Sequence, residues 1–255
     1  MNVGIDHLVI AVADPDDAVI RFEGAIGRAP TGGGSHEALG TFNRLVWFGD
    51  TYLEFIGVFD RRLAERSWIG LPAVRALDAG GGLATWAIAT DDLDADLAPL
   101  RARGSNLGDP LAGERQRPDG AIARWRLAAP TSLGPEEPPF LIEHDPTAAE
   151  WTPADRAERA AMADRLGGPV ALQVLELAVD DPNLVSQRFA RTAGLRFRPS
   201  LAGGGARDTN VGAQIVRLRP RRGGGAGSTV VRLRAPVAAE RSVELFGCRW
   251  VLLPA

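Results

Sequence analysis

Three ionisable residues lie inside apolar segments that have the pattern of β-strands, namely His7, Glu54 and Glu143. Side chains alternate between the two faces of a strand, so Glu54 shares a face with Tyr52, and Glu143 falls at the matching place in a second copy of the pattern. If these strands are neighbours and the two copies face each other, one imidazole and two carboxylates converge on an otherwise apolar surface. Such a set can bind a divalent metal ion and leave coordination positions open. We therefore predict that His7, Glu54 and Glu143 are metal ligands.

Glu54 and Tyr52 are the predicted catalytic residues. A carboxylate held loosely at a metal can also act as a base, and Tyr52, the only tyrosine in the chain, can donate a proton. The alternative is that His7 and Glu54 form a buried hydrogen-bonded pair without a metal, because an unpaired buried carboxylate is costly.

Five further side chains are predicted to contact a small-molecule substrate. His36 and Asn43 flank a Gly-Thr bend near the mouth of the expected cup. Arg124 and Arg126 share a strand face and could grip an anionic substrate, although a solvated sheet face explains the same alternation. Trp86 is predicted to line the wall of the pocket.

The elements that would position these residues repeat along the chain. An apolar strand, an acidic helix start and an amphipathic helix that ends at a glycine occur in copies that begin near residues 5, 84 and 172. In the first copy, Asp14 and Pro15 suit the first turn of the helix, because aspartate accepts hydrogen bonds from free backbone amides and proline needs no such acceptor. Gly27 suits the end of that helix. Each copy predicts a β-α-β-β-β unit.

The fold class that follows is α+β, built from tandem β-α-β-β-β units. The first two units are expected to pair into a cup, and the third has diverged. The boundaries predicted from the sequence are residues 1–60 and 82–146 for the paired units, 1–147 for the domain that they form, 148–168 for a connector helix and 169–255 for the third unit.

Composition excludes several classes of function. Apolar residues make up 45% of the 255 residues and charged residues 24%, which is ordinary for a globular protein. The formal net charge of −3 offers no basic surface for nucleic acid, and no apolar run reaches the length of a membrane span, so neither is an expected partner. A single cysteine and the lack of a basic leader favour a cytoplasmic location. None of the 29 basic residues is a lysine, which rules out a Schiff base with the protein.

Similarity to a known family is carried by five segments, at 5–12, 40–46, 48–56, 86–93 and 124–127. They resemble the vicinal oxygen chelate superfamily, which includes glyoxalases, extradiol dioxygenases and bleomycin-resistance proteins. More narrowly, they resemble the bacterial glyoxalase-like domain. The resemblance covers residues 3–146 well and the remainder only as a diverged third unit.

The resemblance also implies a set of metal-ligand positions. In that superfamily a metal is commonly held by residues from the first and fourth strands of two paired units. Carried over by position, these residues are His7, Glu54, Ala84 and Glu143. Alanine cannot bind a metal, so at most three of the four positions can supply ligands unless His36 or water completes the shell.

The leading hypothesis is a divalent-metal-dependent enzyme of the isomerase or lyase type. The metal would polarise two neighbouring oxygens of a small substrate and stabilise an enediolate. A dioxygenase is less expected, because it requires a second histidine, which only His36 could supply. The alternative is a metal-free protein that binds or sequesters a small molecule in the same cup. A third hypothesis is that the third unit mainly supports a homodimer interface.

Overall fold

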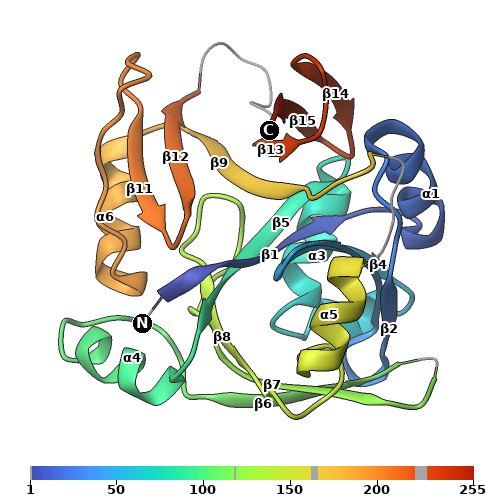
Figure 1. Cartoon of the computed structure of the whole chain (residues 1–255). Helices are drawn as coiled ribbons and strands as arrows, with labels where there is room; N and C mark the ends of the chain where they lie inside the picture. Colours follow the sequence, from blue (N-terminus) through green and yellow to red (C-terminus); the bar gives the residue numbers. More distant parts are fainter. Residues whose placement is uncertain (1, 118, 162–165, 222–228) are drawn as a thin grey trace.

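The computed structural model describes residues 2–117, 119–161, 166–221 and 229–255, and within them the strands form two sheets (Figure 1). The first sheet has eight strands in the order β2-β3-β4-β1-β5-β8-β7-β6. The second has seven strands in the order β10-β11-β12-β9-β13-β15-β14. The predicted α+β class is confirmed.

Two β-α-β-β-β units make up the first sheet. The first unit contains β1 (Asn2–Ala11), α1 (Pro15–Ile26), β2 (Gly32–His36), a 3-10 turn (Glu37–Leu39), β3 (Thr41–Phe48) and β4 (Thr51–Val58). The second contains β5 (Gly82–Thr90), α4 (Leu93–Arg101), β6 (Leu111–Gln116), β7 (Ile122–Ala128) and β8 (Phe140–His144). The connection between them carries α2 (Arg61–Ala64) and α3 (Gly70–Asp78).

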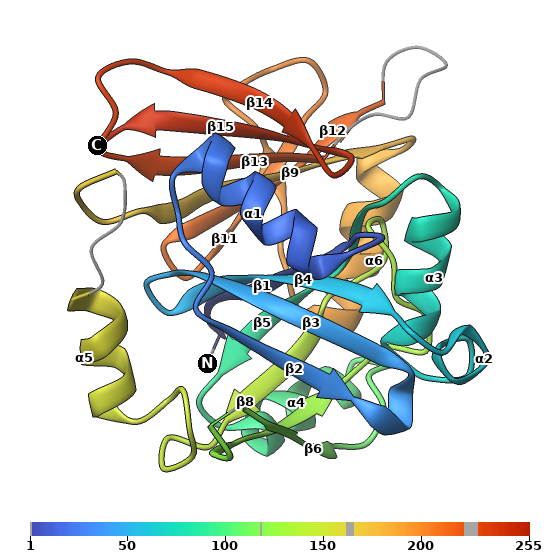
Figure 2. The same cartoon turned by 90° about the vertical axis from the view of Figure 1, so that its right-hand side faces the viewer.

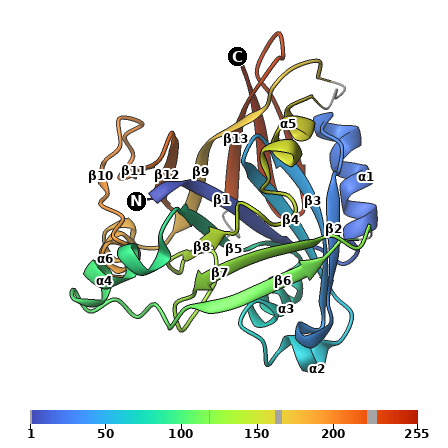
Figure 3. The same ribbon diagram turned by 60° about the horizontal axis from the view of Figure 1, so that its bottom comes forward.

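The two units pair through their first strands. β1 runs antiparallel to β5 and parallel to β4, while β5 runs parallel to β8, so each unit repeats the same order outward from the centre. The outermost strands β2 and β6 approach each other, and the sheet curls into a nearly closed cup (Figure 3). The predicted cup of two paired units is confirmed.

The second sheet repeats this strand order. The third unit of the chain forms one half of this sheet and contains β9 (Ala171–Val179), α6 (Pro182–Ala193), β10 (Arg198–Pro199), β11 (Arg207–Val211) and β12 (Gln214–Pro220). It is followed by β13 (Thr229–Ala235), β14 (Arg241–Leu245) and β15 (Cys248–Pro254). β12 and β13 flank β9 in the same parallel and antiparallel senses as β4 and β5 flank β1, and β15 is parallel to β13 as β8 is to β5. The last three strands therefore correspond to a shortened fourth unit, which the sequence did not predict.

The two sheets share one core. Figure 2 shows α1 lying between the C-terminal sheet and the strands of the first unit. The ring of Phe22 on α1 lies 5.4 Å from Phe55 in the first sheet and 4.9 Å from Trp250 in the second, between centroids. Phe189 on α6 likewise packs against Trp86 on β5. All five residues belong to one buried cluster that draws on both sheets, which leaves the concave face of the cup outside this core.

Local sequence signals set the helix ends and connectors. The side chain of Asp14 accepts hydrogen bonds from the first turn of α1, and Gly27 ends this helix with a φ of 92°. The predicted connector 148–168 contains the helix α5 (Pro153–Ala161), while its residues 162–165 lie outside the described part of the chain.

Among the described residues, no helix combines the length and apolar character needed to cross a membrane.

Candidate functional site

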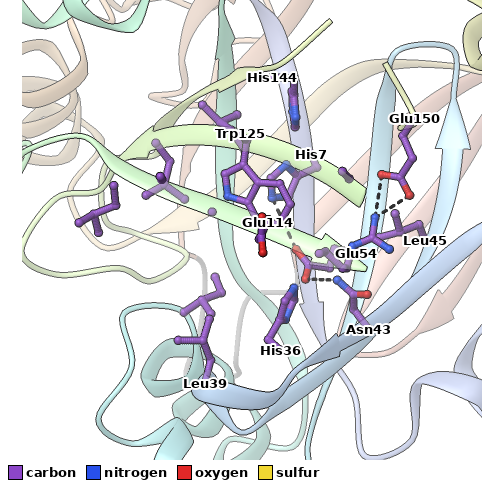
Figure 4. A pocket seen from close by; sticks show the side chains of 18 of the residues that line it. His7, His36, Leu39, Asn43, Leu45, Glu54, Glu114, Trp125, His144 and Glu150 are labelled. Atoms are coloured by element: carbon purple, nitrogen blue, oxygen red, sulfur yellow. Dashed lines mark hydrogen bonds and ion pairs between the residues drawn. The ribbon is translucent and has the colours of Figure 1, made fainter. Parts of the chain in front are cut away.

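The structure brings His7 and Glu54 together on the concave face of the cup (Figure 4). They come from parallel neighbouring strands, β1 and β4, whose register sets His7 beside Tyr52 and Val9 beside Glu54. His7 Nε2 lies 3.6 Å from Glu54 Oε2, and both side chains are buried. Glu54 Oε1 accepts a hydrogen bond of 2.7 Å from Asn43 Nδ2. Asn43 thereby fixes the carboxylate with its other oxygen toward the imidazole.

A β-bulge in β1 turns Asp6 toward the same imidazole. The register between β1 and β5 shifts between Ile5 and His7, so Asp6 is an extra residue in β1. Its buried carboxylate lies 2.5 Å from His7 Nδ1. An ionised carboxylate only accepts hydrogen bonds, so Nδ1 donates to Asp6, and Nε2 is the ring nitrogen that faces Glu54.

The second oxygen of Asp6 is bound by a histidine from the second unit. His144 Nε2, at the end of β8, lies 2.9 Å from Asp6 Oδ2, and the His144 ring stacks on Trp151 with centroids 3.9 Å apart. Burial by itself raises the pKa of Asp6, but the charge of His144 and the hydrogen bonds from His144 and His7 outweigh it and hold this pKa well below its usual value. Asp6 therefore stays ionised and orients both imidazoles.

These groups open onto a cavity of about 520 Å³ within the cup. Its remaining wall is mostly apolar and aromatic, and includes Leu45, Trp68, Trp125, Phe140 and Ile142. A cavity of this volume, with a few polar groups on an apolar wall, suits a small molecule.

Tyr52 and His36 face the same cavity. The Tyr52 ring stacks on His7 with centroids 4.5 Å apart. Burial, together with the negative charges of Asp6 and Glu54, raises the pKa of Tyr52 well above its usual value, so the phenol keeps its proton. Burial also lowers the pKa of His36, outweighing the neighbouring Glu54 carboxylate, so this imidazole is neutral at pH 7.

The lowered pKa of His36 predicts a specific loss of stability in mild acid. Below about pH 6.5, an unfolded histidine takes up a proton that the half-buried imidazole of His36 resists, so the unfolded state binds more protons and stability falls as the pH falls. One such group changes the free energy of unfolding by up to about 1.4 kcal/mol per pH unit. We expect His36→Gln to flatten this dependence between pH 6.5 and 5, as measured by chemical denaturation at a series of pH values. An unchanged slope in the variant would contradict the assignment.

Glu143, a predicted metal ligand, does not join this site, because the structure places it apart from His7 and Glu54. On β8, Phe140, Ile142 and His144 line the cavity. Glu143 alternates with them along the strand, so its side chain points to the opposite side of the sheet. There Glu143 Oε2 lies 3.3 Å from Arg126 Nη1, in a hollow outside the cup. Aligning the two units by sequence matches Glu143 with Glu54, which places β8 one residue out of register with β4. A shift of one residue exchanges the two faces of a strand.

Three of the predicted substrate contacts also lie away from the cavity. Arg124 and Arg126 are exposed on the outer face of β7, where Arg126 pairs with Asp94 at 2.7 Å. Trp86 is fully buried in the core shared by the two sheets, on the far side of β5. The structure therefore does not bring these three residues to the cavity, and the solvated sheet face explains the two arginines. Asn43 and His36, by contrast, do line the cavity.

The donor groups present do not fit a resident divalent metal ion. His7 and Glu54 are close enough to share an ion. In the second unit, however, Ala84 cannot be a ligand, Glu143 lies outside the cup, and His144 Nε2 is directed at Asp6. Within the described residues, no group of three or more His, Cys, Asp or Glu side chains is arranged to hold a metal. Catalytic metal centres usually have three protein ligands, so the predicted metal cofactor lacks a donor set.

Sequence reasoning missed His144, Arg115 and Glu150 in the cavity wall, and it missed the Asp6 carboxylate that binds His7. Strict strand alternation placed Asp6 opposite His7, and only the bulge brings the two side chains together. The Asp-His dipeptide in an apolar strand was the available signal for this pair. Arg115 and Glu150 meet only through the fold, because 35 residues separate them.

Comparisons with known proteins agree with this architecture. The chain superimposes on a hypothetical protein from Staphylococcus aureus with a TM-score of 0.78 and 15% identity, over 98% of this chain and 99% of that one. Methylmalonyl-CoA epimerase from Mycobacterium tuberculosis gives a TM-score of 0.43 and 22% identity, over 56% of this chain and 87% of the epimerase. A methylmalonyl-CoA epimerase in complex with methylmalonyl-CoA and NH4+ also gives a TM-score of 0.43 and 22% identity, over 58% of this chain and 99% of that one. No curated protein matches the chain.

The match to a protein-family pattern identifies the family of this chain, because the match extends over most of the chain. The pattern named glyoxalase-like domain matches residues 5–193, which include both units of the cup and the first strand and helix of the third unit. The resemblance that the sequence motifs suggested is confirmed, and the chain belongs to the glyoxalase-like domain family.

Proposed function

We propose that this protein is an acid–base enzyme of the isomerase type, which moves a proton within a small carbonyl compound without a resident metal. The observation that carries the proposal is the arrangement at His7, whose Nδ1 is held by Asp6 while Nε2 faces Glu54 Oε2 at 3.6 Å. Two atoms that can exchange a proton thus lie side by side at the wall of a cavity of about 520 Å³.

The two groups have complementary roles in such a reaction. Glu54 Oε2 accepts a proton from the carbon next to the substrate carbonyl, and the electron pair of that C–H bond moves onto the carbonyl oxygen as an enolate. His7 Nε2 can take this proton from Glu54 and return it at another atom of the substrate, since the Asp6 carboxylate stabilises the imidazolium that forms. Every proton removed is returned, so the reaction is an isomerisation and needs no co-reactant. Tyr52, predicted as a proton donor, keeps its proton and stacks on the imidazole.

Hydrogen–deuterium exchange at carbon tests this proposal without knowledge of the natural substrate. We expect the protein in D2O to speed the loss of the C–H proton signals of hydroxyacetone or dihydroxyacetone, as followed by NMR. Glu54→Gln should slow this exchange by about 100-fold or more, the usual effect of losing a general base. Excess EDTA should leave the rate unchanged.

Glu143→Gln is the matched control, because Glu143 carries the same carboxylate on the outer face of the same sheet. Its exchange rate should equal that of the wild type. Loss of exchange on both EDTA treatment and Glu143 substitution would instead support the metal-dependent hypothesis. Saturable quenching of tryptophan fluorescence by these compounds with no exchange of any of them would support a small-molecule binding protein.

A further inference from the structure

Arg115 brings a buried positive charge to the wall of the same cavity. Its residue is only 5% exposed, and it comes from β6, the outermost strand of the second unit. Nη2 donates to both oxygens of Glu150, at 2.6 and 2.7 Å. Nη1 is buried and has no hydrogen-bond partner. A buried guanidinium donor without an acceptor is costly, so a ligand oxygen that accepts a hydrogen bond from Nη1 would be bound favourably.

The surroundings hold Arg115 in this orientation. Glu150 has a φ of 73°, which a residue with a side chain rarely adopts. Its backbone carbonyl accepts a hydrogen bond from Arg159 Nη1, and the Arg159 guanidinium lies 3.9 Å from the centre of the Trp47 ring. Strain of this kind persists only where neighbouring contacts enforce it, and here it directs both oxygens of Glu150 onto one nitrogen of Arg115.

A short chain of contacts joins Arg115 to the proposed base. Gly34 on β2 packs so closely on β6 that a Cβ atom there would lie 3.1 Å from Arg115 Cγ. The Gly34 amide donates to Asn43 Oδ1 at 2.9 Å, and Asn43 Nδ2 donates to Glu54 Oε1. Both Arg115 and Glu54 lie near enough to His36 to act on its pKa, which Glu54 raises and Arg115 lowers. The guanidinium and the base therefore belong to the same end of the cavity.

We infer that Arg115 Nη1 donates a hydrogen bond to the substrate carbonyl oxygen as that oxygen becomes an enolate. This inference rests on the proposed function and deepens it. The charge of Arg115 is already balanced by Glu150, so the Glu54 carboxylate disfavours a substrate that enters as an anion. When Glu54 takes the carbon-bound proton, its negative charge moves to the substrate oxygen and the total charge of the cavity is constant. A donor placed for that oxygen stabilises the transition state more than the ground state. The substrate class is therefore a small neutral carbonyl compound.

Binding of glycolate, a small monoanion with a carboxylate in place of the enolate, tests this inference. Because the anion should bind only when Glu54 is protonated, calorimetry in buffers of different ionisation enthalpy should show uptake of about one proton per glycolate bound. The affinity should rise as the pH falls from 8 to 6. Glu54→Gln should bind glycolate with no proton uptake. The double variant R115Q/E150Q, which removes both members of the buried ion pair and so leaves no unpaired charge, should bind at least tenfold more weakly.

Arg124→Gln is the control, because Arg124 is exposed on the outer face of the neighbouring strand β7. It should bind glycolate and catalyse exchange as the wild type does. In R115Q/E150Q the exchange of hydroxyacetone should lose mainly kcat, and near-UV circular dichroism checks that the double variant is folded. A folded double variant with unchanged glycolate affinity and kcat overturns the role of Arg115, as does a wild type that binds glycolate without proton uptake. Exchange that still depends on Glu54 would then leave the proposed function standing, whereas absence of exchange in the wild type overturns the proposed function itself.

Discussion

Replacing Asp6 by asparagine should lower the free energy of unfolding by about 3 kcal/mol at pH 7 and slow the proposed carbon exchange by about 10- to 100-fold. The wild-type carboxylate is buried and accepts hydrogen bonds from His7 and His144 at once. An amide of the same shape offers one accepting oxygen, so it can hold only one imidazole in its present tautomer. The other must turn or lose its partner, and the direction of His7 Nε2 toward Glu54 is then no longer fixed.

The pH dependence of this effect has a definite sign. The folded state depresses the pKa of Asp6, so the carboxylate stabilises the fold above the pKa of an unfolded aspartate, which is about 3.9. That contribution is lost progressively as the pH falls below this value. The stability difference between the wild type and Asp6→Asn should therefore be largest near pH 7 and shrink below pH 4, as measured by chemical denaturation at both pH values. Asp109→Asn, on an exposed loop, is the control and should change little. If the difference in the free energy of unfolding between the wild type and Asp6→Asn stayed constant with pH, the charge of Asp6 would not be the source of the stabilisation.

Much of the architecture was predictable from the sequence because it depends on local signals. Aspartate at the helix start, proline after it and glycine at the end recur at Asp14 and Gly27 and again at Asp181 and Gly194. Alternation of apolar residues along β1 and β4 also placed His7 and Glu54 on one face. These signals need only the residue types and the period of a regular helix or strand.

The predictions failed where the structure departs from that regular period. The bulge at Asp6 is one extra residue in a strand, and no residue type in β1 requires it. At β8, a register error of one residue put Glu143 on the face that Ile142 and His144 occupy, because the faces of a strand alternate with a period of two. The Arg115–Glu150 pair depends on the curl of the sheet, which brings β6 against β2. A pattern read along the chain contains no information on that closure.

The shortened fourth unit was missed for a related reason. β13, β14 and β15 follow one another in the described chain without the helix that marks the other units, so the strand-helix pattern does not recur. Their pairing with β9 and with each other shows the repeat that the sequence hides. This has a thermodynamic consequence, since the cup and the C-terminal sheet bury their apolar faces against the same core.

Phe22→Ala should therefore destabilise the cup and the C-terminal sheet together. Phe22 is fully buried on α1, and its ring contacts Phe55 of the first sheet and Trp250 of the second. Removing a buried phenylalanine side chain costs about 3–5 kcal/mol, from lost burial and from the cavity that remains. Because the lost contacts belong to both sheets, the variant should still unfold in a single transition, with a lower denaturation midpoint.

Hydrogen exchange in the native state can follow each sheet separately, through the amides of β1 and of β13. Both sets should lose protection by the same free energy in Phe22→Ala. Ile20→Ala on the same helix is the matched control, because Ile20 is 69% exposed and should leave both sets nearly unchanged. If β1 kept its wild-type protection while β13 lost it, the two sheets would be independent folding units that only touch through α1. Equal losses would mean that the geometry of the cup, including the position of Asp6 in its bulge, depends on the C-terminal sheet that lies behind it.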